Sequence, residues 1–298
     1  MKYTLSADEP LNVAYCLESG QVFRWQKNGD VWTGVIKGKV CKIQQNGKTL
    51  TYTGFTHEEL RDYFGLNLRF SEVERSFSQP EVKHLLDRYT GLRILHQDLY
   101  ECILTFLLAT NTSIRRIKKM IEVLSVTYGE KIKSGSEIYY SFPLPENIVR
   151  EPASISKCKL GFREERVVEF AKQVLDGTVN LEKISLMNYR NARNALMNIW
   201  GVGQKVADCV CLFALKHYNS FPVDTHIRKW FARQRYMELK DIYPKLGDKG
   251  HLSKKLYERI GEFAVRRFGK YAGYVQQYIY LEELDKYKPQ PYNPSFQR

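Results

Sequence analysis

The sequence predicts an α+β protein: a small antiparallel β-sheet domain at the N-terminus, followed by a mainly α-helical region. Residues 1 to about 55 alternate apolar and polar side chains with period two, which is typical of half-buried strands. From about residue 57 onward the apolar positions recur at helical spacing. With 298 residues, 43% of them hydrophobic, the chain is long enough to bury a substantial core.

The strands are predicted where glycine-containing turns interrupt the alternation. Residues 31–36 and 40–43 are separated by Lys37 and Gly38, and Gly47 precedes a third run at 50–52. Because the connections are this short, the strands are expected to pair antiparallel. We therefore assign residues 1–80 to an antiparallel β domain and residues 81–298 to the helical region.

The helices follow from periodicity and from residues that stop or cap them. Gly129 is a plausible helix stop, residues 110–112 break a helix pair, and a proline-containing loop is predicted over 141–152. A proline-rich tail begins at Pro289. Helices are predicted at 57–64, 80–89, 101–108, 114–128, 161–175, a segment ending at 197, 205–216, 225–236, 253–267 and 271–286.

Charge and cysteine content restrict the class of protein. The formal net charge of +13 favours a polyanionic partner, although charge alone indicates only non-specific attraction. The cysteines at 16, 41, 102, 158, 209 and 211 form no C-x-x-C pair, so we expect no zinc site and no disulfide framework. The sequence shows no signal-peptide run and no apolar stretch of membrane-spanning length, so we expect an intracellular protein, in a bacterial or archaeal cytoplasm.

Residues 195–209 carry the strongest functional signal. An apolar helix runs into Gly201-Val-Gly203 and restarts as a second helix with Lys205 in its first turn. The glycines let the chain turn tightly and approach another molecule closely. The new helix N-terminus points unpaired N–H groups outward, which suits a phosphate. A lysine beside this positive end is disfavoured in its charged form, so a neutral, nucleophilic amine is easier to reach.

This stretch, spanning a helix-hairpin-helix at about 190–216, and the later Asp224 resemble the helix-hairpin-helix DNA glycosylase superfamily. Further blocks at 19–25, 91–111, 205–211 and 271–276 resemble, in order, its eukaryotic-type 8-oxoguanine DNA glycosylase/lyase branch. The hairpin alone indicates the superfamily, whereas the blocks together indicate the branch. The resemblance covers nearly the whole chain, and it implies that the helical region is a glycosylase domain.

The resemblance implies catalytic roles for Lys205 and Asp224. The lysine would attack C1′ of the sugar, expel the damaged base and form a Schiff base that permits β-elimination. The aspartate would stabilise positive charge on the reacting sugar. Without the resemblance, Lys205 could be a solvated lysine and Asp224 a helix N-cap, a role compatible with catalysis. His226 matches a contact to the phosphate of the flipped nucleotide.

The resemblance also implies a base pocket. Gln276 would read the Watson–Crick edge, and Tyr280, where the family usually has phenylalanine, would stack on the base. Cys209 would cover the other face, although helix cysteines are usually small core residues. The carbonyl of Gly20 would accept the N7–H that distinguishes 8-oxoguanine from guanine, and Gly20 is also consistent with a plain turn.

Residues matching the readers of the opposite strand are Asn111, Arg116 and Arg163. Phe162, where the family more often has tyrosine, would insert into the base stack. The arginines could instead contact phosphates only. Trp200 is a departure, because such hairpins commonly carry Leu-Pro-Gly.

We therefore expect a monomeric bifunctional enzyme that excises 8-oxoguanine from double-stranded DNA, opposite cytosine, with no cofactor and no metal. An iron–sulfur centre is excluded because no cysteine follows Cys211. The alternatives are a helix-hairpin-helix glycosylase for another lesion, such as an alkylated purine, and a non-catalytic DNA-binding module.

Overall fold

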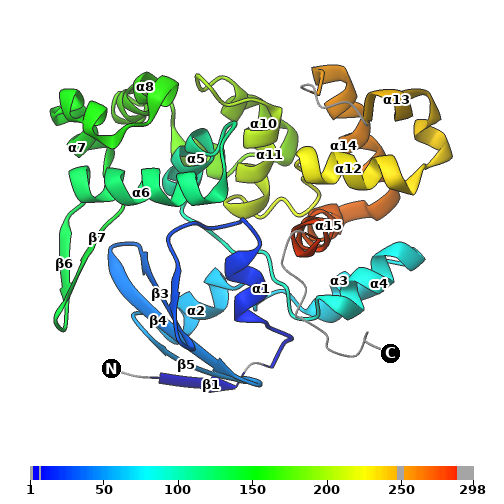
Figure 1. The fold of residues 1–298 in the computed structure, drawn as a ribbon, viewed down its shortest axis with the longest axis horizontal. Coiled ribbons are helices and arrows are strands. Elements are labelled where there is room, and N and C mark those ends of the chain that lie inside the picture. Colours follow the sequence, from blue (N-terminus) through cyan, green and yellow to red (C-terminus); the bar gives the residue numbers. More distant parts are fainter. Residues whose placement is uncertain (1–2, 7, 247–251, 287–298) are drawn as a thin grey trace, which may run out of the picture.

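The computed structural model describes residues 3–6, 8–246 and 252–286, and it has the predicted α+β architecture (Figure 1). A five-stranded sheet lies on one side, and most of the helices that follow it in the chain lie on the other. The predicted tail from Pro289 lies outside the described residues. Within the described ranges, no helix has both the length and the apolar character needed to cross a membrane.

The sheet is antiparallel, with strand order β1-β5-β4-β3-β2. The three predicted strands are confirmed, and their register sets Trp32 opposite Ile43 and Ile43 opposite Tyr52, all of them buried. Lys37 and Gly38 turn the chain with positive φ values of 47° and 75°. The strands are β1 (Tyr3–Ser6), β2 (Gln26–Asn28), β3 (Val31–Ile36), β4 (Lys39–Asn46) and β5 (Thr49–Thr53).

The predicted helices are confirmed, with ends that differ by a few residues. Gly129 caps α6, as predicted, and its N–H donates to the Ser125 carbonyl. These helices are α2 (His57–Tyr63), α4 (Pro80–Arg88), α5 (Leu99–Leu108), α6 (Ile114–Tyr128), α8 (Glu164–Leu175), α10 (Tyr189–Met197), α11 (Gln204–Phe213), α12 (Thr225–Gln234), α14 (Lys254–Phe268) and α15 (Ala272–Asp285).

Two predictions for short segments are wrong. The period-two region contains a helix, α1 (Val13–Glu18), which starts because the Asn12 side chain accepts a hydrogen bond from the Tyr15 N–H. The predicted loop over 141–152 contains α7 (Pro145–Arg150), where proline occupies the first turn and loses no helical hydrogen bond. The strands β1 and β2 were not predicted. Also unpredicted were the helices α3 (Phe70–Arg75), α9 (Leu181–Ser185) and α13 (Tyr243–Leu246), and the hairpin β6 (Lys131–Ser134) and β7 (Glu137–Tyr140). Short 3₁₀ segments are η1 (Pro152–Cys158), η2 (Gly161–Arg163), η3 (Met237–Ile242) and η4 (Gly269–Tyr271).

Buried apolar side chains form a smaller cluster in the sheet and a larger one among the helices. The smaller cluster contains Trp25, Trp32 and Phe55 and extends along the chain to Leu66, with Leu95 added. Phe70 already belongs to the larger cluster. The division at residue 80 stays a prediction, and the packing favours an earlier boundary, between Leu66 and Phe70.

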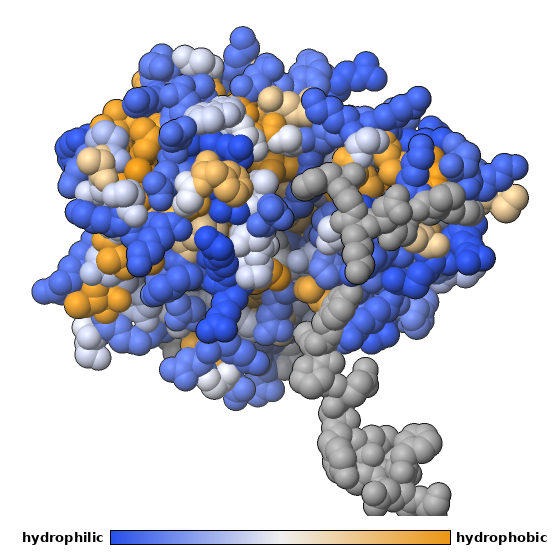
Figure 2. All heavy atoms as spheres, turned by 45° about the horizontal axis from the view of Figure 1, so that its top comes forward, coloured by the Kyte–Doolittle hydropathy of each residue, from blue (hydrophilic) through white to orange (hydrophobic). Residues whose placement is uncertain are grey.

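Helix α11 is the centre of the helical body. It packs against α5 and α10, while α15 packs against α12 and α4. The ribbon places α15 between the helical body and the sheet side of the molecule, close to α1 (Figure 1). The face shown in Figure 2 is mostly hydrophilic, in keeping with the net charge of +13.

Candidate active site

The predicted hairpin joins α10 to α11, and its glycines have different roles. Gly201 has a φ of +90°, and a Cβ placed there would lie 2.6 Å from Cδ of Arg166, so the turn needs glycine. Gly203 has extended backbone with a φ of −95° and caps α11. A Cβ on Gly203 would meet no atom within 4 Å. The tight turn therefore depends on Gly201, whereas Gly203 leaves open space at the start of α11.

Lys205 lies in the first turn of α11, as predicted. Its Nζ lies 5.1 Å from the ring centroid of Phe106 on α5, a cation–π distance. Gly203 supplies no capping side chain, and the first turn of α11 holds no acidic residue. The backbone N–H groups at this helix end therefore point outward toward any anion.

Asp224 is the N-cap of α12. Its Oδ1 accepts hydrogen bonds from the backbone N–H groups of His226 and Ile227, both at 2.9 Å. The capping role considered from the sequence is therefore present. These bonds fix the orientation of the carboxylate.

The Cys209 thiol connects Lys205 with Asp224 electrostatically. Cys209 follows Lys205 by one turn of α11 and is buried. Burial raises the pKa of its thiol to about 11; Lys205 lowers that pKa, and the charges of Asp208 and Asp224 raise it. The amine and the carboxylate thus act on the same buried atom, which brings the three predicted residues into one cluster.

Tyr280, His226 and Gly20 complete this cluster. The rings of His226 and Tyr280 meet edge to face, with centroids 5.4 Å apart. Burial, and then the charges of Asp224 and Cys209, raise the pKa of Tyr280 above its usual range. A Cβ placed on Gly20 would lie 2.9 Å from Cε1 of Tyr280, so the backbone of Gly20 lies directly against this ring.

The turn at Gly20 is held by its neighbour Gln21, which is fully buried. The Gln21 amide donates to Arg93 O at 3.0 Å and accepts from Leu95 N at 2.9 Å. Gln97 Nε2 donates to the Gln21 carbonyl at 2.8 Å. These bonds attach the turn after α1 to the segment that leads into α5.

Gln276 lies one turn before Tyr280 on α15 and is 3% exposed. Its Oε1 accepts a hydrogen bond from Gln277 Nε2 at 2.7 Å. Its polar partner is therefore a neighbour on the same helix rather than a member of the cluster around Lys205.

The predicted opposite-strand residues gather where α5, α6 and η2 meet. Arg163 is buried, and it donates to Leu160 O at 3.2 Å and to the carbonyl of Thr110. Asn111 follows Thr110, is exposed, and has a φ of +51°. Burial, and then the charges of Arg116 and Arg166, lower the pKa of Arg163. The arginines are thus close enough to repel one another, an arrangement that attracts anions.

An exposed aromatic and cationic row continues from this cluster to the hairpin. Phe162 is 56% exposed and Trp200 is 48% exposed. The Arg166 guanidinium lies between them, 5.0 Å from the ring centroid of Phe162 and 5.8 Å from that of Trp200. Trp200, the departure from the usual hairpin, therefore extends the surface formed by Phe162 and Arg166.

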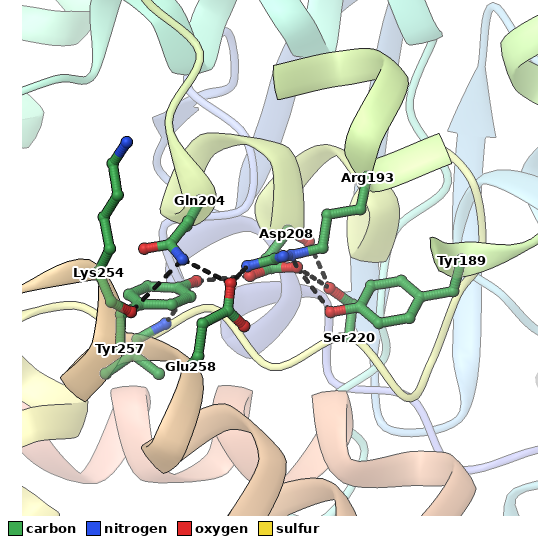
Figure 3. Close-up of polar contacts among 9 residues, drawn as sticks. Tyr189, Arg193, Gln204, Asp208, Ser220, Lys254, Tyr257 and Glu258 are labelled. Carbon is green, nitrogen blue, oxygen red and sulfur yellow. Dashed lines mark hydrogen bonds and ion pairs between the residues drawn. The ribbon is translucent and has the colours of Figure 1, made fainter. Parts of the chain in front are cut away.

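The sequence reasoning missed Phe106, Arg166 and the buried carboxylate of Asp208. Asp208 accepts hydrogen bonds from residues of three other segments of the chain, as Figure 3 shows. The signal for Asp208 was available, because it is the one charged residue in the run 206–213 of apolar side chains. Such a residue in a buried helix needs partners.

The structure offers no clustered metal ligands in the part of the chain that it describes. No group of three or more His, Cys, Asp or Glu side chains lies close enough to hold a metal ion there. The six cysteines are free and buried.

A hairpin with a lysine in the first turn of its second helix, and an aspartate at the cap of the next helix, defines the class of helix-hairpin-helix DNA glycosylases. The family of the 8-oxoguanine DNA glycosylase N-terminal domain matches residues 3–103. The N-glycosylase/DNA lyase OGG1 of Arabidopsis thaliana is 30% identical over 297 residues, covering 93% of this chain and 79% of that protein. This chain therefore belongs to the 8-oxoguanine DNA glycosylase/lyase family.

Solved structures of an 8-oxoguanine glycosylase/lyase are also similar to this chain. The apo form of the Clostridium acetobutylicum 8-oxoguanine glycosylase/lyase is 28% identical, with a TM-score of 0.82, and the match covers 94% of this chain and 95% of that chain. The same Clostridium enzyme in complex with double-stranded DNA containing cytosine opposite 8-oxoguanine is 27% identical, with a TM-score of 0.80, and the match covers 96% and 98% of the two chains.

Proposed function

We propose that this protein excises 8-oxoguanine from double-stranded DNA and then cleaves the resulting abasic site, with Lys205 as the nucleophile. The observation that carries this assignment is the position of Lys205 in the first turn of α11, just after Gly203, which supplies no capping side chain and leaves open space at this helix end. A lysine nucleophile suits this reaction because a covalent intermediate divides one difficult displacement into easier steps.

The first step exchanges one bond at the sugar for another. Lys205 Nζ forms a bond to C1′ as the bond from C1′ to the base breaks, and the bonding electrons leave with the base, which takes up a proton. Asp224, fixed by its capping bonds to His226 and Ile227, faces the positive charge that develops on the sugar. The lysine then loses a proton, and opening of the sugar ring gives the Schiff base.

The second step uses that Schiff base to cut the strand. Loss of a proton from C2′ moves electrons toward the imine and breaks the C3′–O bond, which releases the 3′ phosphate. The backbone N–H groups at the start of α11 and His226 bind the phosphates beside the lesion. The open space at Gly203 leaves room for the DNA backbone to approach.

The extruded base lies between Tyr280 and Cys209, with Gly20 at its edge. A base taken out of the duplex needs apolar faces on both sides and polar groups at its edge. The close approach of the Gly20 backbone to the Tyr280 ring supports this arrangement. Gln276, oriented by Gln277, reads the Watson–Crick edge.

The opposite strand is read by Asn111, Arg116 and Arg163, with Phe162 inserted into the base stack. Guanidinium groups offer paired donors to a base edge, and an exposed aromatic ring can fill the space that the extruded base leaves. The mutual repulsion of the arginines and the exposure of Phe162 support this role. The protein acts as a monomer, in a prokaryotic cytoplasm.

Borohydride trapping tests the nucleophile. The intact protein is expected to form a covalent adduct with a duplex that contains 8-oxoguanine opposite cytosine, and Lys205→Gln is expected to form none. Lys39→Gln, at an exposed lysine on β4, is the matched control and should trap like the intact protein. An adduct that survives Lys205→Gln would overturn the assignment, and tight binding without any adduct from the intact protein would favour a DNA-binding module.

Excision opposite each of the four bases tests the lesion and the opposite-strand residues together. We expect the fastest excision opposite cytosine, and a smaller preference for cytosine after Arg116→Ala. Equal rates opposite all bases in the intact protein would contradict the assignment of these arginines.

A further inference from the structure

The helix that carries Lys205 contains a carboxylate that the proposed reaction does not use. Asp208 is 2% exposed. Its Oδ1 accepts from Tyr189 OH at 2.7 Å and from Arg193 Nε at 2.8 Å, and its Oδ2 accepts from Tyr257 OH at 2.7 Å (Figure 3). Burying a carboxylate is unfavourable unless donors surround it, so this site is built around the charge.

Asp208 also holds the loop that leads from α11 to Asp224. Ser220 Oγ donates to the backbone carbonyl of Asp208 at 2.8 Å. The hydroxyl of Tyr257, which donates to Asp208, accepts from Val223 N at 3.2 Å. Val223 directly precedes Asp224. Ser220 therefore attaches the loop to α11 at Asp208, and Tyr257 attaches the end of the loop just before the cap at Asp224.

Glu258, which follows Tyr257 on α14, binds Arg193 and Gln204 on the other side of this site. Glu258 Oε1 accepts from Arg193 Nη2 at 3.0 Å and from the amide of Gln204. Gln204 directly precedes Lys205. Adjacent residues of α14, Tyr257 and Glu258, therefore hold the residues that immediately precede Asp224 and Lys205.

We propose that Tyr257 and Glu258, joined through Asp208 and Arg193, are positioning residues that fix Lys205 and Asp224 relative to each other. The inference rests on the proposed function, because it assumes that this lysine and this aspartate act in one step. A buried ion pair contributes little net stability compared with apolar packing, so its main contribution here is geometry. A displacement of about 1 Å between reacting groups can cost roughly 100-fold in rate.

The test separates two reactions that depend differently on this spacing. Base excision needs Lys205 and Asp224 together, whereas Schiff-base formation on a preformed abasic site has no base to expel and depends mainly on Lys205. Tyr257→Phe removes the hydroxyl that reaches Val223, and Gln204→Ala removes the bond to Glu258. The matched control is Tyr278→Phe, a buried tyrosine whose hydroxyl has no hydrogen-bond partner among the described residues.

We expect Tyr257→Phe and Gln204→Ala each to slow single-turnover excision of 8-oxoguanine by about 10- to 100-fold. Trapping on an abasic duplex should fall by less than about 3-fold, duplex affinity should be unchanged, and Tyr278→Phe should leave both rates intact. Measurement well below the unfolding midpoint of each variant keeps the whole sample folded.

Full excision activity in Tyr257→Phe and Gln204→Ala would overturn the proposal. Equal losses in excision and in abasic trapping would also overturn it, because they would indicate general damage to the fold. Failure of the proposed function gives a different result: the intact protein would then form no adduct, or Lys205→Gln would still form one.

Discussion

The backbone of Gly20 lies against the ring of Tyr280, so closely that a single added carbon on Gly20 would come within 2.9 Å of Cε1 and 3.0 Å of the hydroxyl oxygen. The two residues come from opposite ends of the chain. Their contact leaves no room for a side chain between the turn after α1 and α15.

Gly20→Ala is expected to abolish efficient excision of 8-oxoguanine, because the new methyl group must displace Tyr280. Gly38→Ala is the matched control, since Gly38 has a similar φ of +75° and open space around its Cβ position. Both variants should lose about 1–2 kcal/mol of stability from backbone strain. Single-turnover rates and thermal unfolding check this, and equal activity in the two variants would contradict the role of Gly20.

Replacements of Tyr280 should separate stacking from the hydroxyl group. Tyr280→Phe keeps the ring and should excise 8-oxoguanine within about 3-fold of the intact protein. Tyr280→Ala removes a stacking surface that is typically worth about 1–3 kcal/mol per base, a factor of roughly 5 to 150. Excision rates at saturating protein measure both effects. A large loss in Tyr280→Phe would mean that the hydroxyl itself contacts the substrate.

Arg166 is expected to contact DNA between the hairpin and Phe162. Arg166→Ala should weaken duplex binding and reduce the slope of log K against log salt by about one. Arg75→Ala on α3, a helix far from α8 in Figure 1, is the matched control and should leave the slope unchanged. Fluorescence anisotropy over a range of salt concentrations provides the slopes, and an unchanged slope in Arg166→Ala would remove this residue from the interface.

His96 is expected to make the protein less stable in mild acid. Burial, and then the charge of Lys216, lower its pKa to about 4, although Asp62 opposes this. Because the folded-state pKa lies below the unfolded value of about 6.5, the stability that neutral His96 contributes is complete above pH 6.5. That stability is lost as the pH falls through 4. Protonation of His96 should therefore lower the free energy of unfolding by about 3 kcal/mol between pH 7 and pH 4.

Denaturant unfolding of His96→Gln measures that contribution, because the variant should show a smaller loss of stability between pH 7 and pH 4. His84→Gln, at an exposed histidine on α4, should behave like the intact protein. If His96→Gln and the intact protein lose equal stability over this range, the burial of a neutral His96 is not what limits acid stability.

Local signals were sufficient for the strands β3, β4 and β5, the longer helices and the helix-hairpin-helix, but not for β1, β2, β6 and β7. Strand alternation and helical spacing reflect which face of each element is buried, so they predict the element without its partners. The resemblance to the glycosylase family singled out Lys205 and Asp224, and their positions at helix starts are local patterns. The helix α1 was missed because its start depends on one capping bond from Asn12, which alternation does not reveal.

Contacts between distant parts of the chain were not available from the sequence. Tyr257 and Val223 lie 34 residues apart, and Tyr257 and Asp208 lie 49 apart. The partners of a buried carboxylate depend on how whole helices pack, which no local pattern reports. The packing of Arg166 against Gly201 could not be predicted for the same reason, because α8 and the hairpin meet only in the folded protein.

Residues that belong to, or lie beside, both buried clusters line the proposed pocket. Lys205 and Asp224 lie on helices of the larger cluster, whereas Gly20 lies in a turn flanked by Leu17 and Val22 of the smaller one. In the proposed function Gly20 contacts the damaged base and Lys205 attacks the sugar, so a change in how the two halves pack is expected to alter base recognition while leaving Lys205 in place. Altered lesion preference is therefore expected from changes at the seam between the two halves.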